Sequence, residues 1–367
     1  MSRRRRAGVI GAVMGIAATG VAAGIAAERI AVGRARLAAD PEAEEPYGLL
    51  VADQEPIVSA DDGVDLHVEV VGRGGADLTM IFVHGYCLDM GTWHYQRRGL
   101  ADLRDPRLKM VFYDQRGHGR SGRGEPPGYT IEQLGRDLES VITAVAPTGP
   151  LVLAGHSMGG MSIMALAEQH PELFAERVVG VALVSSSAGD LDTVSFGMPR
   201  VVNVIRKPLM PLLASGLRSR AKLLERARRT GSDVVWLATR RWAFGTRQVS
   251  SALVGYVERM NSTTPVETIA GFLATLSDHM RYDALPAFDG IETILIGGEK
   301  DLMTPIEHTR RLAVAMPAAE FVEIAGGAHL ALMDHAEEVN DHLRRFLLRA
   351  AAAVPFTGRQ RKVRRGR

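Results

Sequence analysis

Cysteine is almost absent from the sequence, because Cys87 is the only one in 367 residues. A single thiol cannot form an internal disulfide, and it cannot build a cysteine-rich metal centre. We therefore expect a fold without disulfides, and neither a metal site nor a cofactor. Hydrophobic residues make up 46% of the chain, which is ample for a large core, so the sequence is typical of a globular protein.

Net charge is also small, at +2, but basic residues gather at both ends of the chain. The arginines at 3–6 and six basic residues between 359 and 367 hide an acidic middle, because residues 7–358 alone carry about −8. A mildly acidic domain with basic ends argues against a nucleic-acid partner, although the tails could touch anionic lipid. We treat residues 353–367 as a basic tail.

One long run lacks charge altogether: residues 7–27, "AGVIGAVMGIAATGVAAGIAA". As a helix this run would be about 31 Å long, close to the thickness of a bilayer core. We therefore expect a single membrane anchor, followed by a linker that ends near residue 48. The basic cluster at 3–6 favours an amino terminus inside the cell and a folded domain outside the cytoplasm. A cleaved signal peptide on a secreted protein is the alternative.

From Ile57 onward, short apolar runs alternate with helical stretches, and each run ends in glycine, serine or a polar residue. This alternation predicts an α/β fold with a mostly parallel central sheet and helices on both faces. Residues 49–186 and 287–352 would form this core. Ligands of such sheets bind beside the carboxyl ends of the strands. The runs are "TMIFVHG", "KMVFYDQRG", "LVLAGHS", "VVGVALVSS", "ETILIGGEKD" and "EFVEIAGGAH".

The stretch "LVLAGHSMGGM" passes from a buried strand through a tight turn into a helix. Its serine, Ser157, stands in a Gly-x-Ser-x-Gly pattern, in which Gly155 and Gly159 remove side chains that would clash. Strand, sharp turn and helix are what a nucleophile elbow requires, because the turn lifts the serine hydroxyl above the sheet.

Four other segments place polar residues just after predicted strands: "HGY" at 84–86, "DQRGHGRSG" at 114–122, Asp301 after "ETILIGGEK" and His329 after "EFVEIAGGA". Together with the elbow, these segments resemble the α/β-hydrolase superfamily over about residues 57–351. The order Ser157, Asp301, His329 matches the family's order of nucleophile, acid and base.

The resemblance implies further roles around the three candidate catalytic residues. It assigns the oxyanion hole to the backbone N–H groups of Tyr86 and Met158. We expect the remaining residues of the motifs to support the elbow and its neighbouring loop, namely His84, Gly85, Gly155, His156 and Gly159.

Two alternatives stay open for the acid and the base. Asp190 follows the strand "VVGVALVSS" and is the runner-up for the acid. His335 is the nearest competitor for the base, but it begins a helical pattern instead of lying in a loop after a strand. Asp114 is expected to brace a loop.

About 100 residues at 187–286 exceed what a crossover between two strands needs, and they predict a helical cap. Its apolar side chains, among them Trp236, Trp242 and Phe244, either pack on the core or line a lipophilic channel. A cap above an elbow commonly shapes the substrate pocket.

The identity of the nucleophile narrows the chemistry. Epoxide hydrolases and dehalogenases of this family attack with aspartate, whereas this chain has Ser157. We expect a serine hydrolase that cleaves a lipophilic carboxylic ester or a lipid through an acyl-enzyme. The alternatives are an acyltransferase or perhydrolase, an amidase similar to proline iminopeptidase, and a ligand receptor without catalysis.

Overall fold

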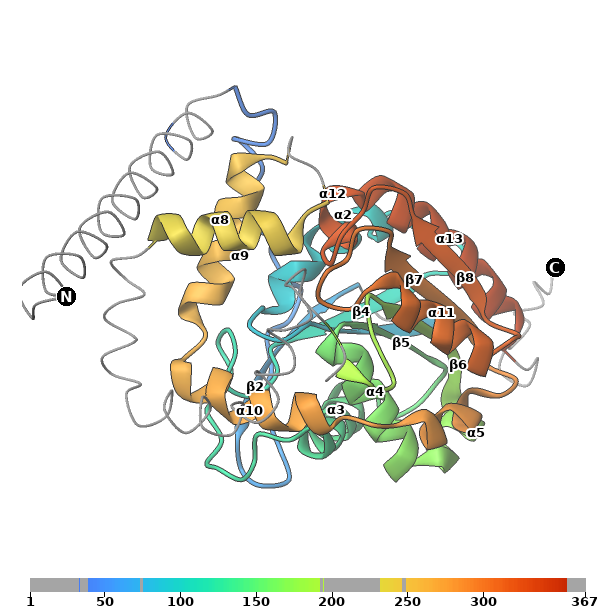
Figure 1. Cartoon of the computed structure of the whole chain (residues 1–367). Helices are drawn as coiled ribbons and strands as arrows, with labels where there is room; N and C mark the ends of the chain where they lie inside the picture. Colours follow the sequence, from blue (N-terminus) through green and yellow to red (C-terminus); the bar gives the residue numbers. More distant parts are fainter. Residues whose placement is uncertain are drawn as a thin grey trace, which may run out of the picture.

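The computed structural model describes residues 39–72, 75–191, 194, 232–245 and 249–354, together with Gly33. Across these residues, eight strands form one sheet in the order β1-β2-β4-β3-β5-β6-β7-β8 (Figure 1). The first two pairings are antiparallel and all later ones are parallel. The strands are β1 Ile57–Ser59, β2 Asp65–Val71, β3 Leu78–Val83, β4 Leu108–Tyr113, β5 Leu151–His156, β6 Val178–Val184, β7 Glu292–Gly298 and β8 Glu320–Ile324.

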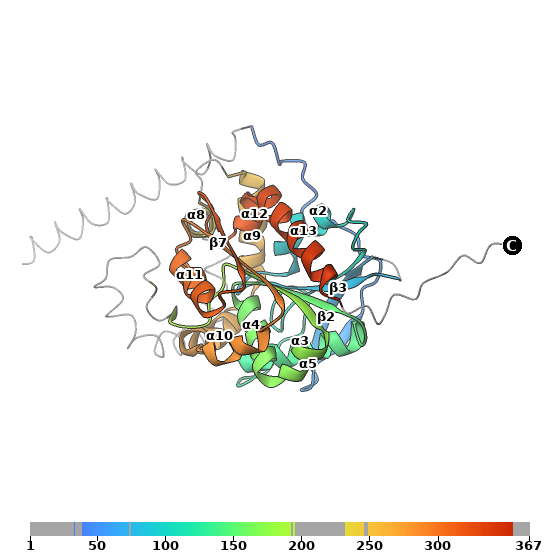
Figure 2. The same ribbon diagram turned by 90° about the vertical axis from the view of Figure 1, so that its right-hand side faces the viewer.

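Helices cover both faces of the sheet, as predicted. In Figure 2, α2 and α13 lie on one side of the strands, and α3 and α5 lie on the other. The helices of the core are α2 His94–Leu100, α3 Ile131–Val145, α4 Met158–Gln169, α5 Pro171–Arg177, α11 Ile306–Ala315, α12 Ala331–Asp334 and α13 Ala336–Ala352, and a 3-10 helix, η1, spans Met90–Trp93.

The two faces of β3 show how the sequence builds these layers. Met80 and Phe82 pack into the cluster under α13, whereas Ile81 and Val83 pack into the cluster under α3 and α4. This alternation follows from the two-residue period of a strand, and a strand with apolar residues at every position is buried on both sides. The expected α/β fold with a mostly parallel sheet is therefore confirmed.

Between β6 and β7 the chain forms further helices: α8 Ser232–Ala243, α9 Ser251–Thr263, α10 Val266–Asp278 and the 3-10 helix η3 Tyr282–Phe288. They occupy the segment in which a cap was expected, although its boundaries at 187 and 286 stay a prediction, and residues 195–231 lie outside the described part. Trp236 and Phe244 are buried in the core cluster, whereas Trp242 is 41% exposed.

The two ends of this segment are tied together beside the sheet. His279 Nε2 donates to the carbonyl oxygen of Ser187 (3.0 Å), and the backbone N–H of Arg281 donates to the carbonyl oxygen of Ala188 (2.6 Å). The buried guanidinium of Arg281 also pairs with Glu168 of α4, at 3.1 Å. The point where the segment leaves the sheet is thus held against the point where it returns.

Residues 40–47, which the sequence suggested as part of a linker, contact both α2 and α9. We call residues 40–47 the strap. Asp40 accepts a hydrogen bond from the backbone N–H of Ala252 (2.8 Å), in the first turn of α9. The Tyr47 ring stacks on Tyr256 of α9 at 4.7 Å, and its hydroxyl lies 2.6 Å from that of Tyr95 in α2. The strap therefore joins a helix of the core to a helix of the expected cap.

The prediction of a membrane anchor is corrected by the structure. Within the described ranges, no helix has both the length and the apolar character needed to cross a bilayer. The predicted span at 7–27 lies outside the described residues, and its abundance of alanine and glycine gives only a weak drive for insertion. On this finding, the predicted transmembrane helix, the membrane partner and the membrane-anchored location are wrong.

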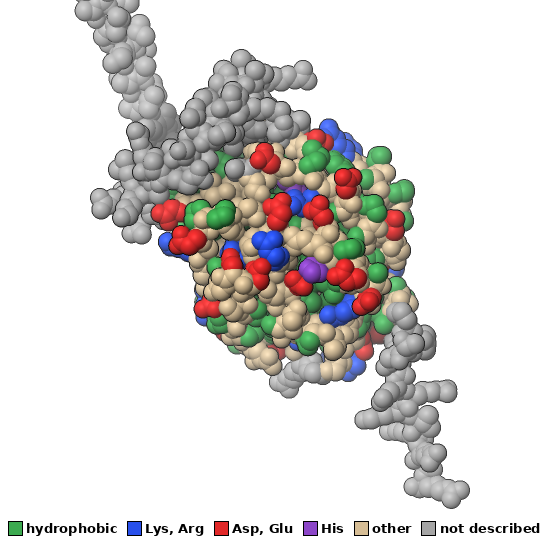
Figure 3. Space-filling view, turned by 90° about the horizontal axis from the view of Figure 1, so that it is seen from below, with side chains coloured by type: hydrophobic (Ala, Val, Ile, Leu, Met, Phe, Trp, Pro, Cys, Tyr) green, Lys and Arg blue, Asp and Glu red, His purple; other side chains and the backbone are tan. Residues whose placement is uncertain are grey.

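Charges of both signs mix on the face seen in Figure 3, where acidic and basic side chains are interspersed. A nucleic-acid-binding face would carry a continuous basic patch instead. On this face the charges therefore have no single sign, and residues 355–367 of the basic tail lie outside the described part.

We expect Tyr47→Ala to lower the free energy of unfolding by about 2 kcal/mol, because it removes the stacking on Tyr256 and the hydrogen bond with Tyr95. Urea unfolding curves would measure the change. Leu49→Ala is the matched control, since the Leu49 side chain is 75% exposed. Equal stability of the two variants would contradict a stabilising role for the strap.

Candidate active site

Ser157 stands between β5 and α4 with φ at 52° and ψ at −117°. This left-handed region is strained for a residue that carries a side chain. The two glycines of the motif make the turn possible. A Cβ at Gly155 would lie 2.4 Å from the backbone nitrogen of Gly160, and one at Gly159 would lie 2.1 Å from the carbonyl oxygen of Val83. The structure thus contains the strand, sharp turn and helix that the sequence predicted around Ser157.

Hydrogen bonds to β6 and to the loop after it hold the elbow in this conformation. The backbone N–H of Ser157 donates to the carbonyl oxygen of Val184 (2.9 Å), and the Ser186 hydroxyl donates to the carbonyl oxygen of Ser157 (2.8 Å). Both partners are buried. Contacts outside the turn therefore maintain a backbone shape that the turn alone would not keep.

Asp301 and His329 meet at the carboxyl ends of β7 and β8. Nδ1 of His329 lies 2.9 Å from Oδ2 of Asp301. The other carboxylate oxygen accepts hydrogen bonds from the backbone N–H groups of Met303 (2.8 Å) and Thr304 (2.9 Å). Burial acts to raise the pKa of Asp301, but the facing His329 ring and these hydrogen bonds outweigh it and leave the pKa below its usual value. An ionised Asp301 places the ring proton on Nδ1 and leaves Nε2 able to accept a proton.

The loop that carries His329 is tied to the elbow. Nε2 of His156, the residue before Ser157, donates to the carbonyl oxygen of His329 (2.9 Å), and the two rings lie 4.8 Å apart. Burial lowers the pKa of His156 to about 3, so this ring stays neutral. His156 precedes Ser157 in the chain, so this hydrogen bond holds the loop of the candidate base against the nucleophile elbow.

Two backbone N–H groups were expected to form an oxyanion hole. Met158 is the first residue of α4, so its N–H has no partner within the helix and lies at the positive end of the helix dipole. Tyr86 follows Gly85, and Gly85 runs so close to the elbow that a Cβ there would lie 3.2 Å from Cβ of Ser157. The structure thus brings this loop against the elbow, and the stabilising role of the two N–H groups stays a prediction.

Neutral histidines brace the loop that contains Tyr86. The backbone N–H of Gln115 donates to Nε2 of His84 (2.9 Å), so Nδ1 carries the proton and donates to the carbonyl oxygen of Gly85 (2.8 Å). His118 accepts from the backbone N–H of Cys87 in the same way (3.2 Å). Burial and the nearby His118 hold the pKa of His84 well below its usual value, and burial lowers the pKa of His118 to about 4.

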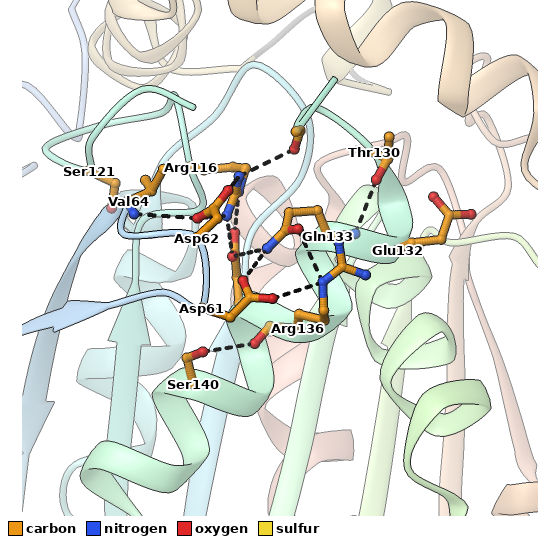
Figure 4. Close-up of polar contacts among 12 residues, drawn as sticks. Asp61, Asp62, Val64, Arg116, Ser121, Thr130, Glu132, Gln133, Arg136 and Ser140 are labelled. Atoms are coloured by element: carbon orange, nitrogen blue, oxygen red, sulfur yellow. Dashed lines mark hydrogen bonds and ion pairs between the residues drawn. The ribbon is translucent and has the colours of Figure 1, made fainter. Parts of the chain in front are cut away.

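Arg116 anchors the loop after β4 from its other side (Figure 4). Its guanidinium is fully buried and donates to Asp137 of α3 at 2.6 Å and to Asp62 of the β1–β2 turn at 2.7 Å. Gln133 of α3 bonds both Asp137 (3.2 Å) and Asp61 (2.6 Å). The network fixes the start of a loop in which His118 contacts the backbone of Cys87.

The alternatives that the sequence left open lie elsewhere in the structure. Asp190 pairs with Arg311 at 3.0 Å, and Nδ1 of His335 lies 2.8 Å from its neighbour Asp334. The structure therefore places Asp301, not Asp190, against His329. Asp114 accepts from the backbone N–H groups of Met90 (2.9 Å) and Arg120 (2.8 Å), which is the bracing contact that was expected.

The sequence did not identify Thr304 and Ser186 as residues that support the candidate site. The Thr304 hydroxyl lies 2.8 Å from Oδ2 of Asp301 and 2.8 Å from the carbonyl oxygen of Ser185. Its place three residues after Asp301, directly before Pro305, was a signal that could have identified it. Ser186 lies in a run of three serines, in which no feature of the sequence distinguishes the one that bonds the elbow.

An apolar cluster joins the elbow to α10. Met158 and Met161 of α4 pack with Tyr129 and with Phe272 of α10. The Tyr86 hydroxyl donates to the carbonyl oxygen of Ile269 in α10 (2.5 Å). The helix above the elbow is therefore held by both apolar and polar contacts.

Comparison with known proteins agrees with this geometry. Residues 79–336 match the family model described as alpha/beta hydrolase fold. The non-heme chloroperoxidase of Kitasatospora aureofaciens is 24% identical over 75% of this chain and 92% of its own. A thermophilic esterase from Thermogutta terrifontis superposes with a TM-score of 0.62 and 25% identity, covering 81% of this chain and 99% of its own. The enol-lactonase of Burkholderia xenovorans, at 23% identity and a TM-score of 0.62 over 80% of this chain and 99% of its own, shares the fold.

Buried histidines make the stability of the folded chain sensitive to mild acid. Burial is the main cause that lowers the pKa of four of them from 6.5: to about 4 for His118 and His279, to about 3 for His156 and to well below the usual value for His84. In the unfolded chain they bind protons near pH 6.5, so each contributes stability that is lost as the pH falls below that value. Burial and the neighbouring Asp89 raise the pKa of Asp114 to about 7, which acts in the opposite direction.

We therefore expect unfolding between pH 6.5 and 5 to take up protons, and the free energy of unfolding to fall with the pH by about 1.4 kcal/mol per pH unit for each net proton taken up. Urea unfolding at several pH values in this range would measure the slope. A free energy of unfolding that is constant across the range would contradict neutral buried histidines.

Proposed function

Because the chain belongs to the alpha/beta hydrolase fold family, and is an enzyme of that family, we propose that it cleaves a carboxylic ester with Ser157 as its nucleophile. One observation carries the proposal: His329 contacts Asp301 at 2.9 Å, and the backbone of His329 is bonded to the residue before Ser157. These are the acid and base that a serine nucleophile needs, in the chain order of the family.

In the proposed reaction, each catalytic side chain acts through one particular atom. Nε2 of His329 accepts the Ser157 hydroxyl proton while Oγ attacks the ester carbonyl carbon. The oxyanion that forms is stabilised by the backbone N–H groups of Tyr86 and Met158. His329 then gives its proton to the leaving alcohol, which departs and leaves an acyl group on Ser157. A water molecule, deprotonated by His329, then attacks the acyl carbon, and His329 returns that proton to Oγ of Ser157 as the acid departs.

Asp301 keeps its charge throughout the cycle. Its low pKa means that it holds the His329 proton on Nδ1 without taking it, and its negative charge stabilises the imidazolium that forms during attack. Hydrogen bonds from Met303 and Thr304 stabilise the same carboxylate.

We assign a lipophilic small molecule as the substrate class. The apolar cluster at the elbow supports this, because Met158 lies directly after the nucleophile, and the partly buried Tyr86, Leu191 and Leu276 pack against it. Apolar side chains with a few polar groups are typical of small-molecule pockets. The relatives described as an esterase and an enol-lactonase act on related bonds.

Acyl transfer to peroxide is the second candidate, because one relative is a non-heme chloroperoxidase. The same acyl-enzyme would then be attacked by hydrogen peroxide instead of water, giving a peracid. Adding peroxide during turnover separates the two: peracid formed faster than free acid supports perhydrolysis, and unchanged acid formation supports hydrolysis. A panel of amide substrates tests the amidase alternative. Binding of a small molecule without turnover would support the alternative of a ligand receptor without catalysis.

We expect Ser157→Ala to reduce turnover by ~10⁶-fold, because the three groups act as a unit. Labelling with a fluorophosphonate probe would report the reactive serine, and a panel of esters of graded chain length would measure the loss of turnover. Ser140→Ala is the control, since its hydroxyl donates to the carbonyl oxygen of Arg136 within α3. Activity of Ser157→Ala within tenfold of the wild type would exclude Ser157 as the nucleophile.

We expect Asp301→Asn to reduce kcat on the order of 10⁴-fold, because an amide donates to Nδ1 and stabilises the wrong tautomer of His329. Asp190→Asn weakens an exposed ion pair with Arg311, away from His329, and should change kcat less than a few-fold. If Asp190→Asn caused the large loss instead, the acid would have to be reassigned to the loop after β6.

A further inference from the structure

Three potential ligands for a metal ion lie together at the antiparallel edge of the sheet, away from Ser157. They are Glu55, His67 and Glu69, and one ligand atom from each lies within 4.8 Å of the others. His67 and Glu69 are two residues apart on β2, so their side chains leave the same face of the strand. The single cysteine led us to expect no metal site, but an imidazole and two carboxylates can bind a metal ion without a thiol.

Strand register places Glu55 directly opposite Glu69. Ile57 pairs with His67, and Gln54 pairs with Val70 in the same antiparallel ladder. Glu55 and Glu69 are therefore cross-strand neighbours. Two like charges directly opposite each other destabilise a sheet unless a cation lies between them.

The His67 side chain is only 2% exposed, and its Nε2 makes no hydrogen bond to any described residue. Oε1 of Glu69 lies 3.4 Å from it, beyond the roughly 2.7–3.2 Å of an N–H···O bond. The same separation suits a metal: two ligand atoms about 2.1 Å from a tetrahedral zinc ion lie about 3.4 Å apart. A buried imidazole nitrogen that makes no hydrogen bond to a described residue is thus spaced from a carboxylate oxygen as two zinc ligands are.

Arginines occupy the remaining positions around the two carboxylates. Arg97 donates to Oε2 of Glu69, the oxygen that faces away from the pair with His67. The Arg120 guanidinium lies 3.0 Å from Oε2 of Glu55 and 3.9 Å from Oε1 of Glu69, so it bridges the two acids. Its side chain is 66% exposed. A cation is therefore already held between Glu55 and Glu69, by a side chain that can move into solvent.

We propose that Glu55, His67 and Glu69 bind a divalent transition cation of the zinc type, which displaces the guanidinium of Arg120. Imidazole with two carboxylates favours such a cation over magnesium or calcium, which prefer oxygen ligands alone. A cavity of about 220 Å³, lined by His67, Glu69 and Arg120 among others, gives room for water as the fourth ligand.

The surroundings suit a preformed site. The backbone N–H of His67 donates to the Ser121 hydroxyl (2.8 Å), and Ser121 in turn donates to the carbonyl oxygen of Asp114 (2.5 Å). These bonds fix the strand that carries two of the three ligands. This proposal does not depend on the hydrolase chemistry of Ser157.

The test is titration of the full chain, prepared without a histidine tag, with zinc chloride in an isothermal calorimeter. We expect saturable binding that His67→Asn weakens by at least about tenfold. Glu55→Gln, at a half-exposed position, removes a second ligand without touching the core and should also weaken binding. Arg120→Gln removes the competing cation and should tighten binding by about two- to fivefold.

His170 supplies the matched control, because its two ring nitrogens lie 3.1 Å from Glu139 and 3.0 Å from Glu172. His170→Asn should leave zinc affinity unchanged, and a Co²⁺ complex of the wild type should show the strong visible absorption of tetrahedral coordination. Absence of saturable binding by the wild type, unchanged binding by His67→Asn, or loss of binding by His170→Asn would overturn the site. Weaker binding by Arg120→Gln would overturn the displacement of that side chain.

Discussion

The positive φ of Ser157 is the constraint on which the rest of the candidate site depends. A non-glycine residue in this conformation costs of order 1–3 kcal/mol and persists only where surrounding contacts enforce it. Here β6 and Ser186 hold the backbone of Ser157 on one side, and the close approach of Val83 to Gly159 leaves no space for relaxation on the other. The loops that carry Tyr86 and His329 are placed by contact with this turn.

Those loops are fixed by groups that stay uncharged at neutral pH. His84, His118 and His156 each use a ring nitrogen to hold a backbone group, and burial keeps all three neutral. A charged ring would have to be hydrated, whereas a neutral ring can donate at one nitrogen and accept at the other. Backbone positions near the elbow are thereby held without adding a charge that would compete with the pair of His329 and Asp301.

The fold and the position of the candidate site were predictable, because parallel strands bring the residues after each strand to one edge. Runs such as "LVLAGH" are buried at every position, and a short run of apolar residues of this kind indicates a central parallel strand. Roles that depend on hydrogen-bond geometry were not predictable. Ser186 is one of three consecutive serines until the chain is folded, and Glu55 becomes a neighbour of Glu69 only through strand register. The membrane prediction failed because length and lack of charge were weighed above the weak apolar character of alanine and glycine.

The strap at residues 40–47 also has a mechanical consequence. Its contacts with α9 and α2 come before β1 in the chain, so a pulling force applied at residue 40 acts first on the hydrogen bond between Asp40 and Ala252 and on the stacked rings of Tyr47 and Tyr256. The sheet bears the load only after these contacts break. Tension on the amino-terminal side of the domain would thus release α9 from the strap while the strands beneath Ser157 remain paired.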